Sequence, residues 1–198
     1  MKRAALTGAS LARYLYPLAA APPAQQTLRR TAMTPPTSPP DPAQEDAKWE
    51  AYPRTVLEFR GLPLLRVDLR EPLDEGARTA LRERVGGAPF GVFTAENPAG
   101  EHAEDAPSEG EESRRERSNA RRTSRLEEEL TRDGVHFVEV DGVSPDGSYR
   151  ERCVAALLAR EEAWALARRF AQLALFWFDG RRFWLLPVIA DKPPHPLP

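Results

Sequence analysis

Amide and guanidinium side chains are the residues best placed for chemistry, and they lie on a helix that the sequence pattern predicts over residues 112–132. At 100° per residue, Asn119 falls within about 60° of Leu126 and Leu130, and Arg122 lies just beside them. Because the leucines must face the core, Asn119 and Arg122 must point along the sheet-facing side of the helix. A guanidinium and the free N–H groups of a helix start both attract an anion. The spacing therefore predicts a site for an anionic small molecule or nucleotide.

The segment before this helix predicts the other wall of the site. Residues 89–95 have the composition of a short buried strand, and Thr94 and Asn97 stand at its end, beside an Asn-Pro turn. The same side chains also fit a structural role, in which Thr94 and Asn97 brace the turn and Arg122 pairs with Glu96. From the residues alone, both interpretations stay open.

Histidine and cysteine provide no metal site in this sequence. The histidines His102, His136 and His195 lack ligand spacing, and the single Cys153 has no base beside it in the sequence. No glycine-rich phosphate loop and no nucleophile motif occur. We therefore predict neither a metal nor a cofactor.

Turn signals and hydrophobic alternation predict the elements that position these residues. An Asp-Gly turn at 179–180 joins strands expected over 173–178 and 181–188, and a second hairpin is expected to join 54–60 to 64–69. Further strands are expected over 89–95, 135–140 and 153–158, and helices over 77–85, 112–132 and 161–171. Strands and helices interleave, but hairpins occupy both ends. We therefore expect an α+β domain with a mixed, mainly antiparallel sheet and about three helices.

Charge and proline content divide the chain. It holds 28 Lys+Arg and 30 Asp+Glu, yet residues 1–40 hold five basic residues and no acidic one, which leaves residues 41–198 with a net charge of −7. We predict a disordered Pro/Ala-rich tail over 1–45, a single α+β domain over 46–190 and a Pro-rich C-terminal tail over 191–198. The first part is alternatively an over-long start with Met33 as the initiator, or a targeting segment. No run approaches the roughly 20 apolar residues that cross a bilayer, so we predict a cytoplasmic protein without membrane contact.

Several short motifs occur in an order that resembles a known family. They are the segment 93–98 (FTAENP), the Asn119/Arg122 helix, Arg150-Glu151 and the segment 168–172 (RRFAQ). Over roughly residues 50–188 the sequence resembles domain-of-unknown-function family 3293, whose members are small and mostly bacterial. The family often has an aromatic residue at the position of Glu96 and a shorter loop than 99–113, and it brings no established activity. The resemblance implies six candidate ligand-binding residues at motif positions: Thr94, Asn97, Asn119, Arg122, Glu151 and Gln172.

Three functions follow as alternatives. The first is a binding module for an anionic small molecule or nucleotide at the start of the central helix. The second is a protein interaction domain that acts through the acidic loop 99–113 and the charged helix. The third is an enzyme, a hydrolase or transferase, with Glu151 or Glu96 as general base. Glutamates surround the arginines of the helix, which argues against nucleic acid as a partner.

Overall fold

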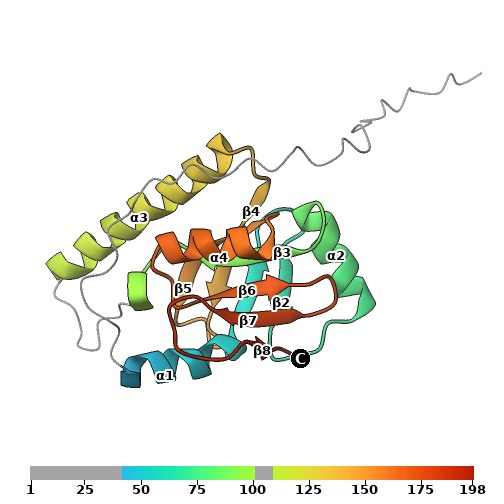
Figure 1. The fold of residues 1–198 in the computed structure, drawn as a ribbon, viewed down its shortest axis with the longest axis horizontal. Helices are drawn as coiled ribbons and strands as arrows, with labels where there is room; N and C mark the ends of the chain where they lie inside the picture. Colours follow the sequence, from blue (N-terminus) through green and yellow to red (C-terminus); the bar gives the residue numbers. More distant parts are fainter. Residues whose placement is uncertain (1–41, 101–108) are drawn as a thin grey trace, which may run out of the picture.

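A computed structural model describes residues 42–100 and 109–198 of the protein. The helices are α1 (Pro42–Ala51), the short η1 (Tyr52–Arg54), α2 (Glu75–Val85), the short η2 (Pro98–Gly100), α3 (Glu109–Arg132) and α4 (Arg160–Arg169). The strands are β1 (Val56–Phe59), β2 (Leu65–Asp68), β3 (Phe90–Thr94), β4 (Phe137–Val143), β5 (Arg150–Ala156), β6 (Ala174–Phe178), β7 (Phe183–Pro187) and β8 (His195–Pro196). Figure 1 shows how they are arranged.

The strands form one eight-stranded sheet in the order β2-β1-β4-β5-β3-β6-β7-β8. The α+β class is confirmed, and every strand pair in the described residues is antiparallel, so the sheet is more uniform than the expected mixed one. Both expected hairpins are present, β1–β2 and β6–β7. At the second hairpin, Asp179 accepts the N–H groups of Arg181 and Arg182, and Gly180 supplies the positive φ that the turn requires.

Each face of the sheet buries its own hydrophobic cluster. On one face, α2 contributes Leu81 and Val85 to a cluster with Phe59, Phe90 and other side chains. The opposite face packs Leu126 and Leu130 of α3 and Leu166 of α4 against the strands. The sequence placed Leu126 and Leu130 on the buried side of the central helix, and the structure confirms this. Helices therefore cover both faces of the sheet (Figure 1).

Close packing of α4 on the sheet depends on a glycine in β3. A Cβ atom on Gly91 would lie 3.0 Å from the Cβ atom of Ala163 in α4. Glycine therefore suits this approach, and a side chain at position 91 would require Ala163 to shift by a few tenths of an ångström.

Regular structure extends beyond both expected ends of the domain, residues 46 and 190. Helix α1 begins at Pro42, where a proline suits the first helical position, and its Trp49 packs against the core. At the other end, β8 pairs with β7. Leu197 is only 2% exposed and packs in the hydrophobic cluster that contains Leu81 and Phe90. Proline is tolerated in β8 because the strand lies at the edge of the sheet. The described helices thus include a fourth long one, α1, that sequence patterning did not predict.

Candidate functional site

The turn after β3 is fixed by side-chain hydrogen bonds. The Thr94 hydroxyl donates to the carbonyl of Arg152 at 2.7 Å and accepts the N–H of Glu96 at 2.9 Å. Asn97 then adopts a φ of 43°, a left-handed conformation that asparagine tolerates better than most residues. Thr94 is therefore occupied in closing the turn.

Asn97 is the link between the central helix and β5. Its backbone N–H donates to Asn119 Oδ1 at 3.0 Å, and Asn119 Nδ2 donates back to Asn97 Oδ1 at 2.9 Å. The Asn97 Nδ2 group donates to both Glu151 Oε1 and the Tyr149 hydroxyl, each at 3.0 Å. The amide thereby fixes the position of the Glu151 carboxyl group.

Arg122 and Gln172 hold the same loop through its backbone carbonyls. Arg122 Nε donates to the carbonyl of Ala95 at 2.6 Å, and its NH2 group donates to the carbonyl of Phe170. Gln172 Nε2 donates to the carbonyl of Glu96 at 2.9 Å and to that of Phe170 at 3.2 Å. These bonds fit the bracing interpretation, although Arg122 binds backbone carbonyls rather than Glu96.

The Glu96 carboxyl group lies between α3 and β5. It accepts weakly from the Thr123 hydroxyl and from the N–H of Arg152, both at 3.4 Å. Burial raises its pKa above the usual range, against these hydrogen bonds and the charge of Arg152.

A cavity of about 510 Å³ opens beside this turn, between α1 and the adjoining ends of β4 and β5. Its apolar walls include Ala47, Ala51, Val143, Pro145 and Phe176. Its polar lining includes Lys48, Tyr52, Arg54, Asn97, Tyr149, Glu151, Cys153 and Gln172. Its volume lies within the range of small-molecule sites.

Of the six residues selected from the sequence, the structure brings Asn97, Glu151 and Gln172 to the cavity wall. The other three, Thr94, Asn119 and Arg122, do not line it and instead hold the turn that carries Asn97.

Glu151 is the most perturbed carboxyl group at the cavity. Burial raises its pKa from 4.5 to about 7, and the charge of Glu96 adds to the rise. Hydrogen bonds from Asn97 and Tyr149 and the charge of Lys48 act in the opposite direction without cancelling it. A carboxyl group that titrates near neutral pH can both donate and accept a proton under physiological conditions.

Three neighbouring groups are held in their protonated forms. Burial, followed by the negative charge of Glu151, raises the pKa values of the Tyr52 and Tyr149 phenols and of the Cys153 thiol. The thiolate is the nucleophilic form of cysteine, so this environment works against thiol chemistry at Cys153. Donor groups thus surround Glu151.

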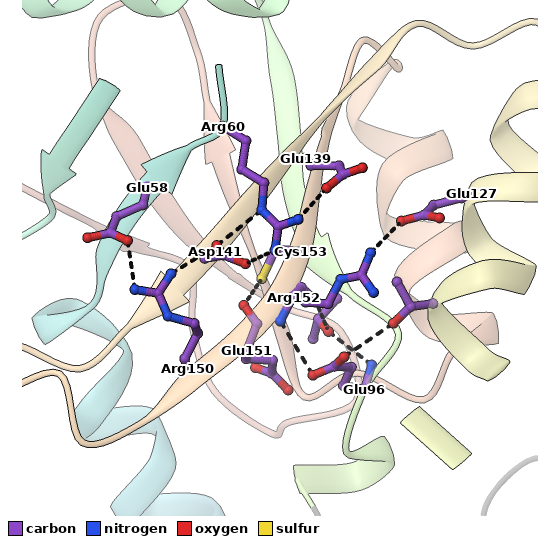
Figure 2. A network of polar contacts seen from close by, with 12 residues as sticks. Glu58, Arg60, Glu96, Glu127, Glu139, Asp141, Arg150, Glu151, Arg152 and Cys153 are labelled. Carbon is purple, nitrogen blue, oxygen red and sulfur yellow. Dashed lines mark hydrogen bonds and ion pairs between the residues drawn. The ribbon is translucent and has the colours of Figure 1, made fainter. Parts of the chain in front are cut away.

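The opposite face of β4 and β5 carries an ion-pair network (Figure 2). Asp141 binds Arg60 at 2.9 Å and Arg150 at 2.9 Å, and Arg150 also binds Glu58 at 2.9 Å. Asp141 is only 6% exposed, and the two guanidinium groups compensate its buried charge. Because successive strand residues point to opposite faces, Arg150 and Arg152 join this side while Glu151 and Cys153 face the cavity.

Sequence reasoning missed Lys48, Tyr52 and Tyr149 as site residues. One signal was available, because Tyr149, Glu151 and Cys153 alternate along the chain and therefore share one face of a strand. No comparable signal existed for Lys48, which lies about 100 residues before Glu151, in a helix that the sequence pattern did not predict.

The remaining sequence predictions concern metals, membranes and the acidic loop. Within residues 42–100 and 109–198, no three or more His, Cys, Asp or Glu side chains are grouped so that they could hold a metal ion. None of the helices in these ranges is both long and apolar enough to span a membrane. Most of the acidic loop 99–113, including His102, lies outside the described residues.

Comparison with known proteins supports the resemblance found in the sequence. The family described as "Protein of unknown function (DUF3293)" matches residues 93–175. This stretch runs from β3 into β6 and contains all six of the residues selected from the sequence, whereas α1 and β7 lie outside it. No curated protein and no solved structure matches the chain.

Proposed function

We propose that this domain binds a small anionic organic molecule in the cavity between α1 and β5, and that protonated Glu151 donates a hydrogen bond to the bound molecule. One observation carries the proposal: a carboxyl group with a pKa of about 7 lines a cavity of about 510 Å³ and is held in place by Asn97. Perturbed carboxyl groups in cavities are concentrated at functional sites.

The lining supports an anionic and partly apolar ligand. Lys48 and Arg54 contribute positive charge, and the phenols of Tyr52 and Tyr149 remain protonated. When Glu151 is protonated, it adds another donor and no negative charge. A carboxylate with an aliphatic or aromatic body would place its charge among these donors and its body against the apolar walls.

This chemistry couples binding to pH. An anion prefers the protonated form of Glu151, because an ionised carboxylate would repel it. With a pKa of about 7, Glu151 is mostly protonated at pH 6 and mostly ionised at pH 8. Affinity is therefore expected to fall by up to about tenfold between these two values.

A thermal-shift screen of small carboxylic acids at pH 6, followed by calorimetry at pH 6 and 8, tests the proposal. Ala51→Phe fills the cavity from α1, whereas Ala165→Phe places the same side chain on an exposed position of α4 as a control. Binding should persist in the control, disappear in Ala51→Phe, and lose its pH dependence in Glu151→Gln. The proposal fails if no acid binds, or if Ala51→Phe binds as well as the control does.

Catalysis is the second candidate, and the same pKa of about 7 favours it, since general acids and bases work best when they titrate near the operating pH. Conversion of a bound acid or of its ester, with turnover abolished in Glu151→Gln but binding retained at pH 6, would assign an enzyme. Binding without turnover would leave the domain a binding module.

A further inference from the structure

A groove of about 360 Å³ along the middle of α3 is lined almost entirely by arginines. Its walls are Arg114, Arg117, Arg121, Arg122 and Arg125, with Ser118 beside them. Phe170, which is buried in the hydrophobic cluster that contains Leu126 and Leu166, also borders the groove. The site lies on α3 and shares no lining residue with the cavity at Glu151.

Helix geometry brings four of these charges into one stripe. Arg114, Arg117, Arg121 and Arg125 are spaced three or four residues apart, so they lie on the same face over about 16 Å of helix. All four are exposed. Like charges at this spacing destabilise a helix by a few tenths of a kcal/mol per pair, so the stripe is not explained by the stability of α3.

Two carboxylates of α3 form their ion pairs away from the stripe. In the second half of α3, Glu127 pairs with Arg152, and Glu129 pairs with Arg132 and Arg169. For Arg117, Arg121 and Arg125, the described part of the chain contains no ion pair. Arg122 has a different role, because it donates to the carbonyls of Ala95 and Phe170 and anchors the groove to the sheet.

The charge is concentrated locally and does not extend along the whole helix. Helix α3 contains seven arginines and seven glutamates, so its formal charge is zero. A long polyanion gains affinity from an extended positive surface that releases many counterions. A neutral helix with one arginine stripe instead suits an anion that places several charges within the length of the stripe.

We propose that this groove binds a compact polyphosphate group, such as the triphosphate of a nucleotide or a short inorganic polyphosphate. Guanidinium groups bind phosphate oxygens through paired N–H donors, and four of them along one helix face match closely spaced phosphates. A monovalent or divalent anion engages only one or two of these arginines and binds more weakly.

Calorimetry with inorganic triphosphate at constant ionic strength tests this inference on the full chain. The test variant is Arg117→Gln/Arg121→Gln/Arg125→Gln. The matched control, Arg66→Gln/Arg160→Gln/Arg181→Gln, removes the same charge from exposed arginines outside the groove. Triphosphate affinity should fall roughly tenfold or more in the first variant and stay within about twofold of wild type in the control. Circular dichroism of both variants should show that the fold is retained.

Four results would overturn the inference: no triphosphate binding by the wild-type protein, equal losses in the two variants, orthophosphate binding as tightly as triphosphate, or a single-stranded oligonucleotide binding more tightly as its length increases. The last would identify a surface that follows a phosphate backbone. Glu151→Gln should leave triphosphate affinity unchanged, because Glu151 does not line the groove. The result for the groove is therefore independent of the function proposed for the cavity.

Discussion

Glu151→Gln is expected to remove a pH-dependent loss of stability. The pKa of Glu151 is raised from 4.5 to about 7, chiefly by burial. Below about pH 4 the carboxyl group is protonated in both the folded and the unfolded chain, so it makes no pH-dependent contribution. Between about 4.5 and 7 the unfolded chain releases this proton while the folded chain retains it. The free energy of unfolding therefore falls as pH rises through this window, and the full loss is present above pH 7.

The magnitude follows from the size of the shift. At 1.36 kcal/mol per pKa unit, a rise from 4.5 to about 7 corresponds to a loss of about 3 kcal/mol at pH 8. Glutamine keeps the shape of the side chain and an oxygen that can accept from Asn97, but it does not ionise. The difference in free energy of unfolding between the variant and the wild type should therefore shift by about 3 kcal/mol in favour of the variant from pH 4 to pH 8. This shift does not depend on the stability of the variant at pH 4.

Urea denaturation of both proteins at intervals from pH 4 to 8.5 measures this difference. Glu161→Gln is a matched control of opposite sign, because Glu161 lies on the surface and hydrogen bonds from its own N–H and from Arg160 lower its pKa. That variant should lose stability relative to wild type as the pH rises. The difference in free energy of unfolding between Glu151→Gln and wild type could instead stay constant from pH 4 to 8.5. That result would refute the claim that burial raises the pKa of Glu151.

Other predictions test how the turn and the sheet are held. Arg122→Gln should lower the free energy of unfolding by about 2 to 3 kcal/mol, since charge-assisted hydrogen bonds to two carbonyls are lost. The control Arg125→Gln, at an exposed position, should change it by less than about 0.5 kcal/mol. Equal effects would reject the bracing role of Arg122. Leu197→Ala should cost about 2 to 3 kcal/mol in the same assay, and a change below about 0.5 kcal/mol would show that the C-terminal residues do not belong to the core. Gly91→Val should cost about 1 to 3 kcal/mol because its side chain would press on Ala163, and Ala163→Gly should recover part of this cost; a neutral Gly91→Val would contradict the close packing of α4.

Local signals in the sequence were sufficient for most of the fold. The Asp-Gly turn at 179–180 requires only two residues and the alternation around them, and the expected hairpin is present. The central helix, expected over 112–132, spans Glu109–Arg132 with its leucines on the buried face. In both cases a pattern within a short stretch of sequence is enough to predict the element.

The candidate site depends on contacts that no local pattern contains. Glu151 was selected only through a family resemblance, because part of the cavity wall around it comes from α1, which lies about 100 residues earlier in the chain. Arg122 was placed correctly on the inward side of its helix, but its partners, the carbonyls of Ala95 and Phe170, follow from the tertiary fold. Side-chain type and direction could thus be predicted, while desolvation and hydrogen-bond partners could not.

Carbon-13 NMR of the Glu151 side-chain carboxyl group, assigned by its absence in Glu151→Gln, tests the central claim most directly. In the free protein the resonance should titrate with a pKa of about 7. Saturation with a carboxylic acid that binds in the cavity should move this pKa upward, because the anion stabilises the protonated form. A pKa near 4.5 that is the same with and without the acid would contradict the account.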